Sequence, residues 1–163
     1  MITPAQAAFL EKSYAAGRAS THPFPEFAAC ETALESAWGT DRLVREANNL
    51  FGQKRDPTIP LDQCIYCDTQ EEDAHGHWYT EHNVPWPMFA SWTACYDARL
   101  ALLKRLAGKY PATYGAALEA KTGELFITLV SRTWSTWTGR AAAALAIYHS
   151  HRDLLGGPGG AVK

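Results

Sequence analysis

The hydrophobic periodicity of the chain is helical at both ends and disappears between Leu50 and Met88. On either side of that segment, apolar residues recur at the spacing expected for the buried face of an amphipathic helix. Four prolines inside it interrupt any helix, because proline lacks the N–H group that a helix interior needs. We therefore expect a helical body with an inserted lobe of loops and short strands.

The first predicted helix begins at Pro4 and closes at Gly17. Thr3 is a suitable N-cap, and Gln6, three residues later, completes a capping box. Proline suits the first helical position, and glycine commonly follows a helix end.

A second helix is predicted from Pro25 to Gly39. A short third helix, capped by residues 40–41, follows to Ala47 and is broken by the two asparagines at 48–49. The second helix has one buried stripe with spacings of three and four: Phe27, Cys30, Leu34 and Trp38.

Helical patterns return over residues 93–106, 123–132 and 140–154. We predict an α+β fold that is predominantly helical, with one catalytic domain over residues 1–155 and its β lobe at about 53–88. The glycine-rich tail, 156–163, is expected to be flexible. A cleft between body and lobe is the natural place for a binding site.

Composition excludes several classes of partner. The formal net charge is −2, so no basic excess points to nucleic acid, and no apolar run approaches the ~20 residues of a membrane span. We expect no nucleic-acid partner and no stable membrane association. Six Trp, seven Tyr and six Phe favour a carbohydrate site, because aromatic rings stack on sugars.

Glu35 is the strongest candidate for acid–base chemistry. It lies near the carbonyl end of the second predicted helix, where the partial charge is negative. Trp38 excludes water nearby, and Glu31 adds a like charge one turn earlier. All three effects favour the protonated carboxyl that glycoside cleavage needs. A solvated glutamate at a helix end is the alternative.

Two ordered motifs surround Glu35, in residues 31–54, which read ETALESAWGTDRLVREANNLFGQK. The segment resembles the glucosaminidase domain of glycoside hydrolase family 73, found in flagellar-rod hydrolases, autolysins and phage endolysins. The family pattern is A-L-E-S-G-W-G, a short helix, then N-N-L-F-G-x-K, and Ala37 stands where glycine is usual. The resemblance implies a lysozyme-like fold, hydrolysis of peptidoglycan β-1,4 bonds and Glu35 as the acid. It also implies substrate-binding residues along the cleft, for some of which turn formation and packing are the alternative roles: Trp38, Asn49, Phe51 and Gly52.

Weaker similarity continues downstream. Residues 89–92, FASW, are similar to the family's F-R-x-Y segment, and residues 134–141, WSTWTGRA, to its Y-[AS]-T-D-P-x-Y-A segment. Trp137 takes the place of the aspartate, so any role of that aspartate is absent or moved. The resemblance implies sugar contacts for Trp134 and Thr136, with core packing as the alternative for the two tryptophans.

The second carboxylate is expected on a mobile β-hairpin, which in the family carries a T-x-E segment before a turn glycine. Thr69-Gln70-Glu71 fits this pattern best, so we predict Glu71. Glu72 and Glu81 are the other candidates. Alternation along a strand sends Glu71 and Glu72 to opposite faces, so only one of them can face a cleft.

One cysteine and histidine pattern lies outside the family resemblance. Cys64 and Cys67 precede His75 and His77 at a spacing that zinc can use. A local disulfide, or free thiols with surface histidines, are the alternatives. We predict no cofactor and no metal, with structural zinc as the less favoured possibility. The remaining cysteines are expected to be core thiols: Cys30 and Cys95.

The sequence thus predicts a monomeric peptidoglycan hydrolase that binds glycan strands, and most specifically an endo-β-N-acetylglucosaminidase. The alternatives are a muramidase or lytic transglycosylase on the same fold, and a non-catalytic peptidoglycan-binding or tail-associated module. Residues 1–19 lack the apolar run of a signal peptide. We therefore expect synthesis in the cytoplasm and release to the cell wall or periplasm, as in a phage or prophage endolysin.

Overall fold

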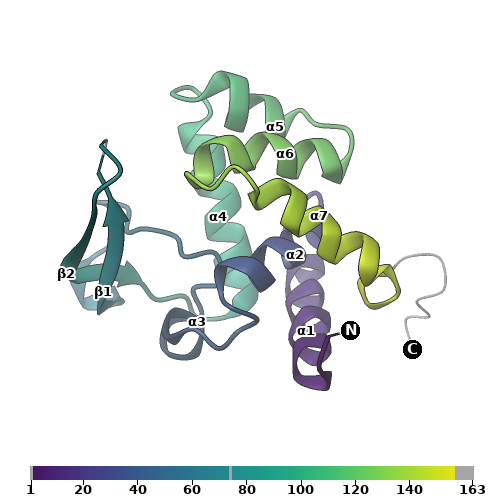
Figure 1. Ribbon diagram of the computed structural model, residues 1–163, viewed down its shortest axis with the longest axis horizontal. Helices are drawn as coiled ribbons and strands as arrows, with labels where there is room; N and C mark the ends of the chain where they lie inside the picture. The colour runs from purple at the N-terminus through teal and green to yellow at the C-terminus, as the bar shows by residue number, and fades with distance from the viewer. Residues whose placement is uncertain (1, 74, 157–163) are drawn as a thin grey trace.

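The computed structural model describes residues 2–73 and 75–156 as a helical body with one two-stranded sheet (Figure 1). This arrangement confirms the predicted α+β, predominantly helical class. The helices are α1 (Pro4–Ala19), α2 (Pro25–Glu35), α3 (Arg42–Ala47), α4 (Trp92–Leu106), α5 (Ala116–Leu118), α6 (Gly123–Trp134) and α7 (Arg140–Ser150). The strands are β1 (Cys64–Glu72) and β2 (Trp78–Pro87), and short helical turns cover Leu61–Gln63, Pro111–Gly115 and Arg152–Leu155.

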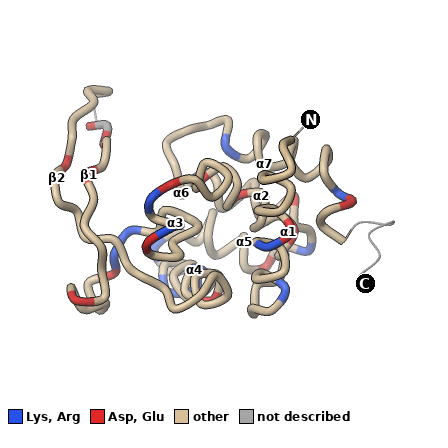
Figure 2. Tube along the Cα trace, turned by 90° about the horizontal axis from the view of Figure 1, so that it is seen from below, with Lys and Arg blue, Asp and Glu red and all other residues tan. Residues whose placement is uncertain are grey.

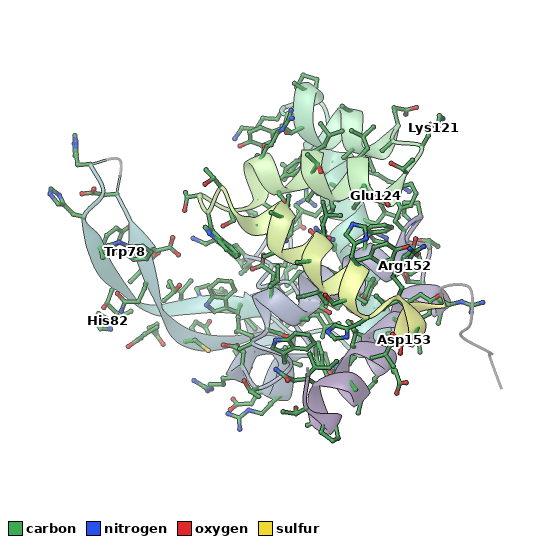
Figure 3. The ribbon with its side chains drawn as sticks, turned by 45° about the vertical axis from the view of Figure 1, so that its right-hand side comes forward. Trp78, His82, Lys121, Glu124, Arg152 and Asp153 are labelled. Carbon is green, nitrogen blue, oxygen red and sulfur yellow. The ribbon has the colours of Figure 1, made fainter. Side chains whose placement is uncertain are left out.

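Strands β1 and β2 form an antiparallel hairpin that extends away from the helices, at the left of Figure 1. Its register runs from the Cys64–Pro87 pair at the base to the Glu72–Trp78 pair near the tip. Figure 3 shows Trp78 and His82 on this arm, well separated from the body. Both side chains are exposed. The predicted lobe is therefore a projecting arm rather than a compact unit.

Two helix ends differ from the sequence prediction. Helix α1 continues through Gly17 to Ala19. Gly17 serves close packing rather than helix termination, because a Cβ there would lie 2.8 Å from Cε1 of Tyr96. Helix α2 ends at Glu35, four residues before Gly39, because residues 37–39 have positive φ angles. The starts of both helices and the whole of α3 are confirmed.

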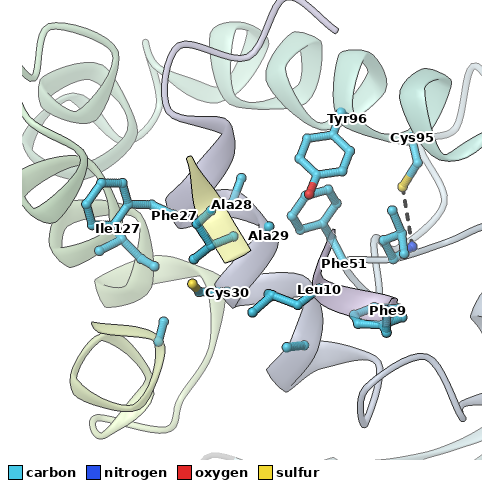
Figure 4. Close-up of a cluster of buried hydrophobic side chains, with 14 of the residues drawn as sticks. Phe9, Leu10, Phe27, Ala28, Ala29, Cys30, Phe51, Cys95, Tyr96 and Ile127 are labelled. Atoms are coloured by element: carbon cyan, nitrogen blue, oxygen red, sulfur yellow. Dashed lines mark hydrogen bonds between the residues drawn. The ribbon is translucent and has the colours of Figure 1, made fainter. Parts of the chain in front are cut away.

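The main core lies where α1, α2 and α4 meet, and Figure 4 shows many of its side chains. Phe9 and Leu10 of α1 pack there against α2. Inside this apolar cluster, the Ser13 hydroxyl lies 2.7 Å from the Thr32 hydroxyl and 2.8 Å from the Tyr96 hydroxyl. The buried polar groups are thereby satisfied, and α1 is fixed to both neighbours.

A second, smaller cluster lies beneath α5 and α6. It is built around Phe126 and Val130 of α6 and Tyr114, which comes from the turn before α5. The sequence analysis did not predict helical structure over residues 111–118. Pro111 and Gly115 look like helix breakers in the sequence, but in the structure Pro111 occupies the first position of a helical turn.

Charged residues of both signs are scattered over body and hairpin, without a large field of one sign (Figure 2). No helix in the described part of the chain has the length and apolar character needed to cross a bilayer. Helix α7 ends at Ser150, before a turn that extends to Leu155. Residues 157–163, which make up most of the predicted flexible tail, lie outside the described residues.

Candidate active site

Glu35 is the last residue of α2, and the turn that follows it is tightly bonded. The Ser36 hydroxyl donates to the Thr32 carbonyl at 2.5 Å and accepts from the Gly39 N–H at 2.9 Å. Ala37 and Trp38 have φ angles of 48° and 59°, in the left-handed region that disfavours side chains. The backbone therefore holds a strained turn directly after the candidate acid.

Arg140, the first residue of α7, donates to Glu35 from inside the protein. Its Nε lies 2.5 Å from Oε1 of Glu35, and its Nη1 donates to Oε1 of Glu31 at 2.7 Å and to the Ser131 hydroxyl at 2.9 Å. The Arg140 side chain is 1% exposed and that of Glu35 is 23% exposed. Glu35 thus lies at the partly open edge of a buried ionic network.

Glu31 is the centre of this network. Arg99 of α4 binds both of its carboxylate oxygens, at 2.6 and 2.7 Å, and Arg140 binds one of them again. Burial opposes ionisation, but the two guanidinium groups outweigh it and lower the pKa of Glu31. The expected like-charge effect of Glu31 on Glu35 is therefore opposed by a cation, since Arg140 bridges the two carboxylates.

Aromatic rings flank the second arginine. The Arg99 guanidinium carbon lies 4.2 Å from the ring centre of Phe51 and 4.8 Å from that of Trp134. This contact connects the two parts of the chain that carry the family resemblance, because residue 51 follows α3 and residue 134 ends α6. Phe51 is fully buried, so it supports the ionic network and cannot contact a glycan.

Asn49 closes the turn that follows α3. Its side-chain oxygen accepts from the Gln53 N–H at 2.9 Å, and its nitrogen donates to the Gln53 carbonyl at 3.0 Å. Asn49 is 1% exposed, so the prediction that it contacts the substrate directly is wrong, as it is for Phe51. The alternative roles, turn formation and packing, apply to both residues.

An open cavity of about 310 Å³ lies beside this turn. Gly52 and Lys54 line it from one side, and Trp134 and Tyr114 line it from the other. Trp134 is half-buried, so part of its ring is available to a ligand. Two of the predicted substrate-binding residues, Gly52 and Trp134, therefore face the same cavity.

The other predicted contacts are more dispersed. Trp38 is half-buried and packs against the main core. Thr136 is exposed and lines a separate hydroxyl-rich hollow with Ser135 and Thr138. Trp137 is 53% exposed and its ring lies over Gly139, so the alternative that it packs in the core is wrong.

Glu71 of β1 forms an ion pair with Lys54, which also lines this cavity. Nζ of Lys54 lies 2.6 Å from Oε1 of Glu71, whose side chain is 24% exposed. In the antiparallel register Glu71 pairs with Tyr79, and Thr69 pairs with Glu81, so these residues share one face of the hairpin. Glu81 is exposed. The backbone of Glu72 is one residue further along β1.

The alternative of a zinc site is wrong. Cys64 begins β1 at the base of the hairpin, whereas His75 and His77 lie beyond Glu72, at its tip. Cys67 is the fourth of the nine residues of β1, so five strand residues, roughly 16 Å of extended chain, still separate it from the strand end before the histidines. Zinc–ligand bonds of about 2 Å cannot span that distance. Among the described residues, no three Cys, His, Asp or Glu side chains gather closely enough to hold a metal ion.

All four cysteines are free thiols, so the alternative of a local disulfide between Cys64 and Cys67 is also wrong. Cys30 and Cys95 are core thiols, as predicted, and the Leu50 N–H donates to the Cys95 sulfur at 3.4 Å (Figure 4). Burial raises the pKa of Cys30, and it raises that of Cys95 to about 12. Neither thiol has the low pKa of an activated nucleophile.

Sequence reasoning missed both arginines of the network. Arg99 follows Tyr96 by three residues and precedes Leu103 by four, so it lies on the buried stripe of its helix, and that spacing was an available signal. A second signal was that Arg140 stands where the resembling family segment has its second tyrosine. Neither signal indicates the partner carboxylates.

Comparison with known proteins agrees with the motifs. The sequence profile of the glucosaminidase family, described as mannosyl-glycoprotein endo-beta-N-acetylglucosaminidase, matches residues 11–150. No curated protein sequence matches the chain at a significant level.

Solved structures share the fold at low sequence identity. The catalytic domain of the autolysin Auto from Listeria monocytogenes has a TM-score of 0.74 and 18% identity, covering 95% of this chain and 88% of that one. A peptidoglycan hydrolase mutant from Sphingomonas sp. A1 has a TM-score of 0.71 and 16% identity, covering 91% and 97%. A truncated glycoside hydrolase domain of FlgJ from Salmonella typhimurium has a TM-score of 0.65 and 20% identity, covering 90% and 97%.

Proposed function

Because the chain belongs to the glucosaminidase family of glycoside hydrolases, we propose that it hydrolyses the glycan strands of bacterial peptidoglycan as an endo-β-N-acetylglucosaminidase. The single observation that carries this proposal is the position of Glu35, partly exposed at the end of α2 within the family motif. The autolysin domain and the peptidoglycan hydrolase that share the fold support the choice of substrate.

In the proposed reaction, Glu35 donates a proton to the glycosidic oxygen as the C–O bond breaks. The bond's electron pair stays with that oxygen, and a positive charge develops on the sugar ring. Water then forms a bond to the sugar carbon and gives up a proton to a carboxylate base, which leaves a free sugar end. Glu35 is left as a carboxylate next to Arg140, an arrangement that favours release of the proton.

We propose Glu71 as the second carboxylate. It activates the water or stabilises the cationic sugar. In the alternative route, the oxygen of the substrate's acetamido group attacks the sugar carbon and forms an oxazolinium ion, which water then opens. The Lys54 contact supports this choice, because Lys54 also lines the cavity with Gly52 and Trp134. Glu81, which is exposed on the same face, is the comparison residue.

The test digests purified peptidoglycan with wild type, Glu35→Gln and a control, Glu46→Gln, then reduces the products with borohydride and identifies their ends by mass spectrometry. Glu46 is an exposed residue of α3 that pairs only with Arg42. New reduced GlcNAc ends from wild type and Glu46→Gln, but not from Glu35→Gln, support the proposal.

Other sugars at the new chain ends would indicate one of the alternative activities. New MurNAc ends mean a muramidase, and 1,6-anhydro ends mean a lytic transglycosylase, for which Glu71 is dispensable. Wall binding without any new ends contradicts catalysis and leaves a peptidoglycan-binding module.

We further propose an endolysin role, in which the enzyme accumulates in the cytoplasm and reaches the wall when the membrane is permeabilised. The support is that α1 packs into the core through Phe9 and Leu10, so residues 4–19 belong to the folded enzyme. Cells that express the chain should lyse only after a membrane-permeabilising agent is added. Intact cells after that treatment, under conditions where extracts digest the wall, contradict the proposal.

A further inference from the structure

Arg140 connects the candidate acid to the buried interior through three contacts on three separate side chains. It donates to Glu35 and Glu31 of α2 and to Ser131 of α6, while it belongs to α7 itself. Only 1% of its side chain is exposed, and a substrate therefore cannot reach it. Such a guanidinium has very little freedom to move, because each contact fixes a different direction of its planar fork.

The contact with Glu35 is one-sided. Only Oε1 accepts from Arg140, through Nε, and within the described residues Nη2 of the same guanidinium has no hydrogen-bond partner. The arginine therefore occupies one carboxylate oxygen and leaves Oε2 without a bond to this group. A carboxylic acid carries its proton on one oxygen at a time, so this asymmetry selects the oxygen that can deliver it.

The charges of the network show how the Glu35 anion is stabilised. The network contains two guanidinium groups and two carboxylates, so it is neutral when Glu35 is ionised. Although burial opposes the charge on Arg140, the carboxylates of Glu31 and Glu35 raise its pKa, so it remains a cation. The anion that Glu35 becomes after it has given up its proton therefore has a fixed counter-charge in contact with it.

We propose that Arg140 is a positioning residue for the glycosidase reaction: it holds Oε1 of Glu35, so that Oε2 alone presents the proton to the glycosidic oxygen. This inference rests on the proposed role of Glu35 as general acid. It goes beyond the family resemblance, because the family segment has tyrosine where this chain has Arg140. The contact is therefore a property of this chain rather than one transferred with the motif.

Two substitutions separate geometry from charge. Arg140→Lys keeps a cation near Glu31 but loses the planar fork, so kcat should fall by about 10- to 100-fold while KM stays within about twofold. Arg140→Gln removes the cation, so the alkaline limb of the pH–activity profile should move up by about one pH unit. Arg99→Lys is the matched control, because Arg99 binds both oxygens of Glu31 and, among the described residues, donates no hydrogen bond to Glu35.

A purely structural role for Arg140 predicts a different pattern. Both Arg140 variants and Arg99→Lys would then lose stability alike, with the pH limb unmoved and kcat per folded molecule unchanged. That result overturns the inference. If Arg140→Gln does not fold, Arg140→Lys decides through the split between kcat and KM.

A readout without turnover separates this inference from the proposed function. In ¹³C-labelled protein at one fixed pH, the Glu35 carboxyl signal, assigned by its loss in Glu35→Gln, should have a different chemical shift in Arg140→Gln than in wild type, because the Nε–H donor is lost. A moved signal in a protein that does not cleave peptidoglycan overturns the proposed function alone. An active wild type whose signal and pH limb are both unaffected by the substitution overturns the role of Arg140.

Discussion

The helical body and the hairpin hold their carboxylates in opposite ways. Glu35, in the body, is bonded to a guanidinium that is 1% exposed and has two further partners. Glu71, on the hairpin, is bonded to Lys54, whose side chain is 61% exposed. The body thus fixes the proposed acid in one geometry, whereas the hairpin presents its carboxylate through a contact that water can replace.

The largest effect should come from removing the centre of the body's network. Glu31→Gln leaves Arg99 and Arg140 buried with one carboxylate too few, so the free energy of unfolding should fall by about 3–5 kcal/mol. Urea unfolding measures this loss. Glu46→Gln, which breaks an exposed pair, should cost less than about 1 kcal/mol. Equal losses in the two variants would contradict a body-centred network.

Alanine substitutions at two glycines compare the motif around Glu35 with the motif that follows α3. Gly39 has a φ of 80°, and an added Cβ would overlap the Phe9 ring, so Gly39→Ala should lower the unfolding free energy by about 3 kcal/mol. Gly52 has a φ of 56° with open space around its Cβ position, so Gly52→Ala should cost only about 1 kcal/mol. Thermal or urea denaturation of both variants checks the order, and a reversed order would refute it.

The pH dependence of stability compares the same two regions through one histidine in each. Burial, with the nearby Arg99 guanidinium, lowers the pKa of His22 to about 3, so His22 stays neutral in the folded body. The unfolded chain binds the extra proton below about pH 6.5, and stability is therefore lost as the pH falls from there towards 3. His22 alone should remove roughly 1 kcal/mol between about pH 6 and pH 5.

Urea unfolding at several pH values tests this dependence. His22→Asn should flatten the slope in this pH range, because the variant has no proton to bind there. His82→Asn on the hairpin is the control for the loss of an imidazole, since His82 is exposed and lies outside the core. A slope that survives in His22→Asn would contradict the assignment to His22.

The smallest effect on stability should come from the contact between hairpin and body. Lys54→Ala removes a partly exposed ion pair, so the free energy of unfolding should change by less than about 1 kcal/mol. Amide exchange in β1 and β2 should become faster, while exchange in α2 stays the same. Faster exchange in α2 as well would mean that hairpin and body are one cooperative unit.

Local signals in the sequence were enough for the elements around the acid. Proline at the start of α2, the Asp41 cap of α3 and the left-handed Asn48 after it all act over a few residues, and each has the predicted role. The early end of α2 was missed because Ala37 and Trp38 adopt positive φ angles, which neither residue type favours.

Long-range pairing could not be predicted in the same way. The partners of Glu31 lie 68 and 109 residues away along the chain, so no local spacing indicates that two arginines bind this carboxylate. The zinc alternative failed for the same reason. Residues that are close in sequence lie far apart in space when an extended strand runs between them. The family motif identified Glu35, but only the fold shows what holds it.

Initial rates of peptidoglycan cleavage, measured side by side for Glu35→Gln, Glu71→Gln and Glu46→Gln at equal folded concentration, test the assignment of the acid to the body. Glu35→Gln should lose about a thousandfold or more, because it removes the proposed proton donor. Glu71→Gln should lose less, and Glu46→Gln should match wild type. A Glu35→Gln protein that retains a tenth or more of the wild-type rate would contradict the assignment.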